Sequence, residues 1–135
     1  HDEYTIVTKC EELILVRMDV QLIIQVLVNL IDNAIKYTPK GSKICIRGMK
    51  CNGKAQICVE DNGPGIADEM KPYIFEMFYT GKNTIADSQR SLGLGLSLCQ
   101  SIIEAHDGRL ILTDNTPRGC IFTFTLPLSE VTLNE

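Results

Sequence analysis

An apolar stripe at helical spacing in the first third of the chain constrains the fold more than any other feature. Asp19 is placed to cap a helix, and the run 38–41, Thr-Pro-Lys-Gly, is placed to end it. Between them, apolar side chains recur every three or four residues at Val20, Ile23, Leu27, Leu30, Ile31 and Ala34. This pattern predicts one amphipathic helix that needs an apolar surface to pack against.

Alternating apolar and polar runs on both sides of this helix predict the strands of a sheet. Two of these runs, at 43–47 and 55–60, are joined through Asn52-Gly53, which is typical of a β-hairpin. Ile and Val share one face of both runs, so one face of the sheet is predicted to be buried and the other solvated. Further strands are predicted at 4–8, 12–17, 109–113 and 120–126. A second helix is predicted from the spacing of Leu94, Leu98, Ile102 and Ala105. This order of elements predicts an α+β fold with helices packed on one face of a mixed sheet.

Length, charge and composition narrow the classes of protein to which the chain can belong. Its 135 residues predict one domain over 1–128 and a C-terminal tail at 129–135. The 13 Lys and Arg are fewer than the 17 Asp and Glu and form no basic cluster, which argues against nucleic acid as a partner. No apolar run is long enough to span a bilayer, so this piece is expected outside the membrane. The six cysteines include no Cys-x-x-Cys pair and are expected to be free thiols.

Two amide side chains at the edge of the apolar stripe are the first candidates for chemistry. Asn29 and Asn33 are four residues apart, so they share a face of the predicted helix, with Lys36 and Tyr37 one turn further on. An unpaired buried amide costs about 1–3 kcal/mol, so both side chains need partners. These partners are either neighbouring backbone groups or a ligand, in which case the amide oxygens would face a hard cation or a phosphate.

Two glycine-rich segments are the next candidates. Asp61-x-Gly63-x-Gly65 follows an apolar strand, where Asp can accept a hydrogen bond from an exocyclic amine and glycine lets a ligand approach the backbone. The run 92–97, Leu-Gly-Leu-Gly-Leu-Ser, opens the second helix, whose free N–H groups can bind an anion. Each segment alone is also compatible with an ordinary turn or a tightly packed helix entry. The polar residues 79–91 are predicted to form a mobile surface loop.

Taken in order, these motifs resemble the ATP-binding catalytic domain of bacterial sensor histidine kinases, in the superfamily that includes gyrase- and Hsp90-like ATPases. Four segments match boxes of that family: the N box at 29–37, the first glycine box at 61–65, the phenylalanine box at 75–78 and the second glycine box at 93–96. The resemblance runs from about Ile6 to Leu128. It implies the two-layer α/β sandwich of the Bergerat, or GHKL, ATPases, with residues 79–91 as a mobile ATP lid and with ATP and Mg²⁺ as cofactors.

The resemblance also implies roles for individual residues. Asn33 would hold Mg²⁺ through its side-chain oxygen, and Asn29 would lie near the triphosphate. Lys36 would meet phosphate oxygens, which makes Asn29 and Lys36 the candidate catalytic residues. Tyr37 would flank the nucleotide, and Asp61 would accept the adenine amino group. The remaining nucleotide-binding positions that the resemblance implies are Gly63, Gly65, Ile66, Phe78, Gly93, Leu94, Gly95 and Leu96.

Asn29 distinguishes two branches of this superfamily. Gyrase-like ATPases carry Glu at this position as a general base, and an amide cannot act as a base. The resemblance therefore implies a domain that transfers the ATP γ-phosphate to a histidine on a separate dimerisation domain of the same parent protein, with a response regulator downstream. The parent would be a membrane-anchored sensor whose catalytic domain is cytoplasmic. The stretch from Phe78 to Gly93 looks most like the potassium-responsive Kdp-type kinases.

Two alternatives stay open on the sequence. One is a stand-alone serine kinase of the anti-sigma-factor type, which shares this fold and size. The other is a module that binds nucleotide without catalysis, because Met77 and Thr80 stand where the phenylalanine box of the family carries basic residues. The run Tyr37-Thr-Pro, the phenylalanine box and the Gly-Leu-Gly-Leu run favour the sensor kinase.

Overall fold

The computed structural model describes residues 5–10, 14, 18–76 and 92–128. Several features predicted from the sequence lie outside these ranges. They are Phe78, the lid at 79–91, the tail at 129–135, and Met77 and Thr80, where the chain differs from the phenylalanine box of the family. The strand predicted at 12–17 also lies outside them, apart from Ile14, which has no regular secondary structure.

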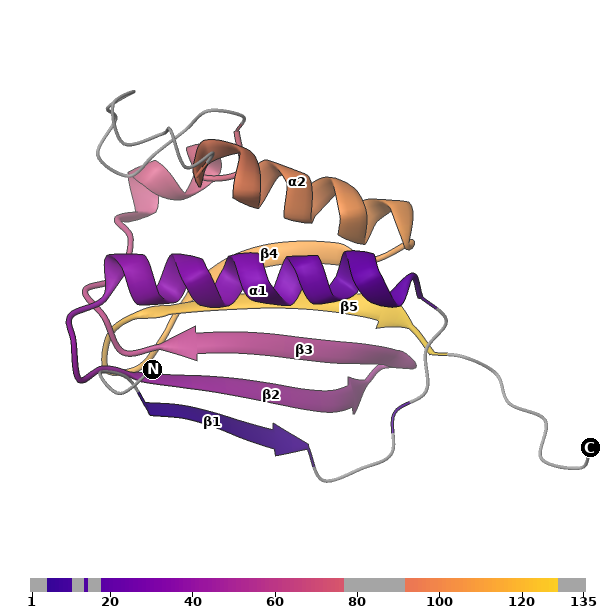
Figure 1. Cartoon of the computed structure of the whole chain (residues 1–135), viewed down its shortest axis with the longest axis horizontal. Coiled ribbons are helices and arrows are strands. Elements are labelled where there is room, and N and C mark those ends of the chain that lie inside the picture. The colour runs from indigo at the N-terminus through magenta and orange to yellow at the C-terminus, as the bar shows by residue number, and fades with distance from the viewer. Residues whose placement is uncertain (1–4, 11–13, 15–17, 77–91, 129–135) are drawn as a thin grey trace, which may run out of the picture.

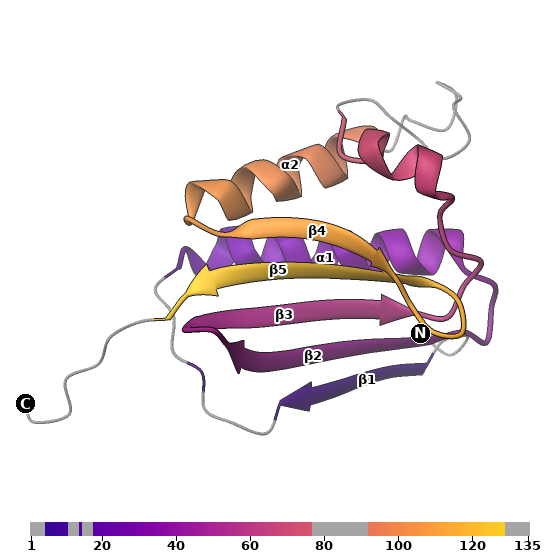
Figure 2. The ribbon, with the colours of Figure 1, turned by 180° about the vertical axis from the view of Figure 1, so that it is seen from behind.

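Within the described residues, a five-stranded mixed sheet carries two α-helices on one of its faces (Figures 1 and 2). In chain order the elements are β1 (Thr5–Cys10), α1 (Val20–Tyr37), β2 (Lys43–Cys51), β3 (Lys54–Asp61), the 3₁₀ helix η1 (Asp68–Tyr73), α2 (Leu92–Ala105), β4 (Arg109–Asp114) and β5 (Cys120–Pro127). The strands lie in the order β1-β2-β3-β5-β4. β1 pairs with β2 in parallel, and the other pairs are antiparallel. The predicted α+β sandwich is confirmed.

Helix α1 begins and ends where the sequence predicts. At its start, Oδ1 of Asp19 accepts a hydrogen bond from the backbone N–H of Leu22 at 3.1 Å. At its end, Thr38 has an extended backbone, which the following Pro39 favours. The Thr38 hydroxyl turns back and donates to the carbonyl oxygen of Ala34 at 2.6 Å. This bond fixes the Thr38 side chain at the point where the chain leaves α1.

The buried face of α1 follows the predicted stripe except at two positions. The predicted residues in the core or packed against it are Ile23, Leu27, Leu30, Ile31 and Ala34. Val20 is 58% exposed, whereas Val26, which the predicted stripe omits, is fully buried. Val26 lies three residues after Ile23 and four before Leu30, so these three side chains form the row that faces the sheet. The prediction was wrong only in including Val20, the first helical residue, and in omitting Val26. Among the described residues, no helix is both long enough and apolar enough to span a bilayer.

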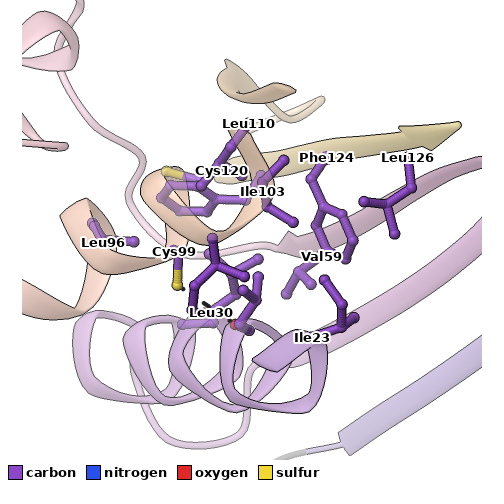
Figure 3. Packing of buried hydrophobic residues seen from close by; sticks show 14 of the residues in the cluster. Ile23, Leu30, Val59, Leu96, Cys99, Ile103, Leu110, Cys120, Phe124 and Leu126 are labelled. Atoms are coloured by element: carbon purple, nitrogen blue, oxygen red, sulfur yellow. Dashed lines mark hydrogen bonds between the residues drawn. The ribbon is translucent and has the colours of Figure 1, made fainter. Parts of the chain in front are cut away.

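The core lies between the two helices and the sheet face that they cover (Figure 3). Phe124 on β5 and Val59 on β3 are buried on that face. Leu30 from α1 and Ile103 from α2 pack against them from the helix layer. Burying one such side chain contributes about 1.5–3 kcal/mol, so this cluster fixes how α1 and α2 lie over the sheet.

The sheet face without helices is less solvated than the alternating pattern predicts. Cys45 and Cys58 point to this face, and both are buried. In the antiparallel register Cys45 lies opposite Glu60 and Arg47 lies opposite Cys58. The ion pair between Arg47 Nε and Glu60 Oε2, at 2.9 Å, therefore runs diagonally across the two strands. All six cysteines of the chain are free.

The β2–β3 hairpin brings the first glycine box to one end of the sheet. The predicted turn at Asn52-Gly53 is confirmed, with φ of 54° and 78° at the two residues. The register that follows from this turn pairs Ile44, near the start of β2, with Asp61 at the end of β3. Because β2 follows directly after α1, Asp61 lies near the C-terminal end of the helix that carries the N box.

Candidate functional site

Asp61 is the most constrained polar side chain of the predicted site. It is only 7% exposed, and its Oδ1 accepts hydrogen bonds from the backbone N–H groups of Gly63 at 2.9 Å and Cys120 at 3.2 Å. Burial raises the pKa of the Asp61 carboxyl, against the smaller lowering effect of these two N–H groups. Both bonds are made to Oδ1, so Oδ2 accepts none from the described part of the chain and is the oxygen left for a ligand.

The first glycine box packs directly against the end of α1. A Cβ atom added at Gly63 would lie inside 3.0 Å of the Thr38 Cγ2 atom, closer than real Cβ atoms approach. The Thr38 side chain is itself held by its bond to the Ala34 carbonyl, so it cannot easily move away. Gly65 has φ of 83°, in the left-handed region that glycine adopts without strain. The segment 61–65 is therefore shaped by the fold before any ligand binds.

Asn29 lies between the two helices, against the second glycine box. A Cβ atom added at Gly95 in α2 would lie 3.9 Å from the Asn29 Cγ atom, which is ordinary contact distance. Asn29 also lies near the thiol of Cys99, one turn further along α2, whose Sγ donates to the Val26 carbonyl oxygen of α1 at 3.8 Å. Burial raises the pKa of Cys99 to about 11, so this thiol stays protonated at neutral pH. The structure thus brings together the N box and the second glycine box.

The remaining N-box residues are more open. Asn33 is half-buried and Lys36 is exposed, both in the last turns of α1. Asn29 and Asn33 share a helix face, as their spacing predicts. Gly93 and Leu94 belong to the first turn of α2. The side chains of Tyr37 and Leu94 lie outside the described part of the structure.

Two of the predicted nucleotide-binding side chains face the core. Leu96 is buried within the hydrophobic cluster, and Ile66 is half-buried and packs against it. The backbone carbonyl of Ile66 accepts a hydrogen bond from Nζ of Lys71 at 3.0 Å. At these two positions a ligand would therefore meet backbone more than side chain.

The turn between β4 and β5 belongs to the site although it was not predicted as part of it from the sequence. The Nδ2 atom of Asn115 donates to the backbone carbonyl of Asp61 at 2.8 Å, and the N–H of Cys120 donates to its carboxylate. In the sequence, residues 115–119 indicate only a turn. Cys120 is 59 positions from Asp61, and only the pairing of β5 with β3 brings the two together. No local pattern signals this contact.

Comparison with known proteins identifies relatives of the chain. A family model described as histidine kinase-, DNA gyrase B- and HSP90-like ATPase matches residues 18–130. The sensor protein KdpD of Clostridium acetobutylicum is 43% identical over 117 residues, which are 87% of this chain and 13% of the relative. The adaptive-response sensory kinase SasA of a Nostoc species is 43% identical over 119 residues, which are 87% of this chain and 29% of the relative. The chain thus spans less than a third of either curated relative.

Solved structures agree with these relatives. The catalytic domain of histidine kinase ThkA has a TM-score of 0.79 at 35% identity, with 93% of this chain and 79% of that chain covered. Histidine kinase ThkA in complex with response regulator protein TrrA has a TM-score of 0.75 at 33% identity, with 93% of this chain and 34% of that chain covered. Similarity in fold and in sequence therefore extends over nearly the whole of this chain.

Proposed function

Because the chain belongs to the family of histidine kinase-, DNA gyrase B- and HSP90-like ATPases, as its motifs predict, we propose that it is the ATP-binding catalytic domain of a two-component sensor histidine kinase. The observation that carries this proposal is the Asp61 carboxylate, which is buried and fixed through one oxygen beside a glycine-lined turn. Relatives include both KdpD and SasA sensor kinases, so the Kdp-type assignment remains a prediction.

Asp61 recognises adenine in this proposal. Its Oδ2 accepts a hydrogen bond from the exocyclic amino group of the base, while Oδ1 stays bonded to the backbone. Gly63, packed on Thr38, and Gly65, with φ of 83°, form the turn that holds this carboxylate in place. A purine with a carbonyl in place of the amino group would bring two acceptors together, so the carboxylate selects ATP.

The polyphosphate lies between α1 and the start of α2 in this proposal. Lys36 contributes a positive charge, Gly93 and Gly95 keep side chains away from the phosphates, and Tyr37 flanks the nucleotide. The described residues hold no group of three His, Cys, Asp or Glu that suits a metal ion. A divalent cation would therefore be held by the Asn33 side-chain oxygen together with the phosphates, an arrangement that suits Mg²⁺.

The chemistry that these residues support is transfer rather than hydrolysis. Asn29 lies near the phosphates as an amide, which cannot take a proton from water as a general base does. Its amide N–H and oxygen can instead serve as polar contacts to the phosphates. Phosphoryl transfer needs little covalent work from the protein, because positioning and charge neutralisation supply most of the catalysis. Mg²⁺, when bound, neutralises phosphate charge.

The partners follow from this function. The acceptor is a histidine on the dimerisation domain of the same parent protein, and a response regulator receives the phosphoryl group next. The solved complex of the relative ThkA with response regulator protein TrrA supports a regulator as a partner. We propose that residues 1–128 form the catalytic domain and 129–135 a tail, in the cytoplasmic part of a membrane-anchored sensor.

Phosphotransfer to a separately supplied dimerisation domain tests the proposal. With ATP labelled at the γ-phosphate, we expect label on the acceptor in an acid-labile linkage, as a phosphohistidine gives. An acid-stable serine ester would instead support the anti-sigma-factor type of kinase, and no transfer despite ATP binding would support a non-catalytic module.

Equilibrium binding of ATP, measured on single-residue variants, tests the roles assigned to individual residues. Asp61→Asn presents an amide N–H to the adenine amino group, and loss of a charged hydrogen bond of about 1.5–3 kcal/mol weakens binding roughly 10- to 150-fold. Asn33→Ala should weaken binding more with Mg²⁺ than with a chelator. Matched controls are Asp107→Asn and Gln25→Ala, at exposed positions. Unchanged binding in Asp61→Asn would refute the adenine assignment, and an equal loss with and without Mg²⁺ in Asn33→Ala would refute the metal assignment.

A further inference from the structure

The turn between β4 and β5 lies against the tip of β3, where Asp61 is found (Figure 2). β3 and β5 pair antiparallel with Glu60 opposite Ile121, and β4 and β5 pair with Asp114 opposite Cys120. Residues 115–119 therefore connect β4 to β5 at the end of the sheet where β3 ends. This register places the turn beside the backbone of Asp61.

Three contacts from this turn hold Asp61. Nδ2 of Asn115 donates to the Asp61 backbone carbonyl at 2.8 Å, and the Cys120 N–H donates to Oδ1 of its side chain at 3.2 Å. Gly119 packs so closely that an added Cβ atom would lie inside 3.0 Å of the same Asp61 carbonyl oxygen. The backbone and the carboxylate of Asp61 are thus held from one side by consecutive parts of a single turn.

The Asn115 amide can take only one orientation in this setting. Its Oδ1 accepts a hydrogen bond from the Thr116 N–H at 2.8 Å, while Nδ2 faces the Asp61 carbonyl. If the amide were flipped, its oxygen would face the Asp61 carbonyl oxygen and its NH₂ group would face the Thr116 N–H, so both hydrogen bonds would be lost. The Asn115 main-chain N–H closes the turn by donating to the Gly119 carbonyl at 2.9 Å. Asn115 therefore forms part of the turn and at the same time reaches out to Asp61.

A second tie holds the other end of the first glycine box. Nζ of Lys71 donates to the Ile66 carbonyl at 3.0 Å and pairs with Oδ1 of Asp114 at 2.9 Å, and it also pairs with Asp68. Asp114 directly precedes Asn115. The hydrogen bonds and charges of Asp68 and Asp114 raise the pKa of Lys71, which keeps its ammonium group charged. Adjacent residues of β4 and its turn thus hold the segment 61–66 at both ends.

We propose that Asn115 is a positioning residue for nucleotide selection, which holds the backbone of Asp61 so that Oδ2 of its carboxylate stays aimed at the adenine amino group. This inference rests on the proposed function and adds a residue outside the four family boxes. A hydrogen bond to adenine depends strongly on angle, so a small shift of the Asp61 backbone would weaken recognition of the amino group. Contacts to the sugar and phosphates, which do not involve Asp61, would be unaffected.

The test compares ATP with inosine triphosphate, which carries a carbonyl in place of the adenine amino group. Asn115→Asp keeps an oxygen for the Thr116 N–H and replaces the donor that reaches Asp61 with a negatively charged oxygen, which repels the Asp61 carbonyl. Asn115→Ala removes both contacts without adding a charge. Arg118→Ala, at an exposed position of the same turn, is the matched control. Dissociation constants for both nucleotides are measured on the wild type and on every variant, with circular dichroism as the check of folding.

We expect both Asn115 variants to bind ATP about three- to tenfold more weakly while their affinity for inosine triphosphate does not fall. The preference for ATP then shrinks, and Arg118→Ala keeps it. A purely structural role for Asn115 would lower both affinities equally, and that result, or an unchanged preference in folded variants, would overturn the inference. The proposed function fails separately, if the wild type shows no preference for ATP or if Asp61→Asn leaves that preference intact.

Discussion

Glycine serves different purposes at the two ends of the proposed nucleotide site. At the purine end, Gly63 and Gly119 have no room for a Cβ atom, because Thr38 and the Asp61 carbonyl already fill that space. At the phosphate end, the nearest atom to an added Cβ at Gly95 is the Asn29 Cγ atom, at an ordinary 3.9 Å. The fold itself requires glycine at the first end. At the second, the described structure has space for a methyl group, so packing does not require glycine there.

The polar side chains follow the same division. Asp61 is buried, and its carboxylate is held by two backbone N–H groups. Asn33 is half-buried and Lys36 is exposed. A preorganised end can select a base by hydrogen-bond geometry, whereas an open end can accept a charged group with its cation and water. We infer that base selection is built into the fold and that the phosphate end is completed when nucleotide binds.

Gly119→Ala should have the largest effect on stability. Gly119 has φ of 113°, and a Cβ atom there would collide with the backbone of Asp61. Backbone strain and overpacking together should lower the free energy of unfolding by about 2–4 kcal/mol, measured by urea denaturation. Gly53→Ala is the matched control, because Gly53 also has a positive φ, of 78°, but nothing lies within 4 Å of an added Cβ atom. If Gly119→Ala lost no more stability than Gly53→Ala, the purine end would not be fixed as described.

Gly95→Ala should show the opposite pattern. Ala is favoured over Gly in a helix by up to about 1 kcal/mol, and the structure has space for the methyl group, so the free energy of unfolding should stay level or rise. The methyl group would nevertheless lie at the start of α2, beside Asn29 of α1, and the phosphates are proposed to bind in this place. We expect ATP affinity to fall about tenfold or more, in a titration run beside the urea curve. Lower stability with unchanged ATP binding would show that Gly95 serves packing instead.

Contacts between residues close in the sequence were predictable, whereas contacts between residues far apart in the sequence were not. The α1 caps at Asp19 and Thr38 and the hairpin at Asn52-Gly53 are local, and each lies where its residue types predict. The family boxes could be recognised because their order along the chain is itself informative. The roles of their residues stay predictions.

The errors and omissions have physical causes. The predicted α1 stripe included the exposed Val20 and omitted the buried Val26, because spacing alone does not say where at its edges a helix face stops contacting the sheet. The contacts of Asn115 and Cys120 with Asp61 depend on β5 pairing with β3, and no short-range pattern indicates that pairing. The bond between the Cys99 thiol and the Val26 carbonyl likewise depends on how α1 packs against α2.

The smallest predicted effect concerns the stability cost of the Asp61 charge. Burial raises the pKa of Asp61 above its usual 3.8, so the folded protein holds this proton more tightly than the unfolded chain does. The ionised carboxylate therefore lowers stability at neutral pH, and this cost disappears as pH falls through the raised pKa. Asn at this position keeps an oxygen for Gly63 and Cys120 without the charge. We expect Asp61→Asn to unfold at a higher urea concentration near neutral pH, by a few tenths to about 1 kcal/mol.

The stability difference between wild type and Asp61→Asn should depend on pH, and this dependence tests whether the fold penalises the Asp61 charge. Urea midpoints of wild type and Asp61→Asn, measured in steps from neutral pH down toward the ordinary carboxyl pKa of 3.8, should converge as the pH falls through the raised pKa of Asp61, because only the wild type regains a neutral side chain there. Asp107→Asn, at an exposed position, controls for the general effect of removing one negative charge. A difference that stayed constant or grew on acidification would mean that the fold does not penalise the Asp61 charge. Convergence together with lost ATP binding in Asp61→Asn would show that the purine end keeps a destabilising charge because the base requires it.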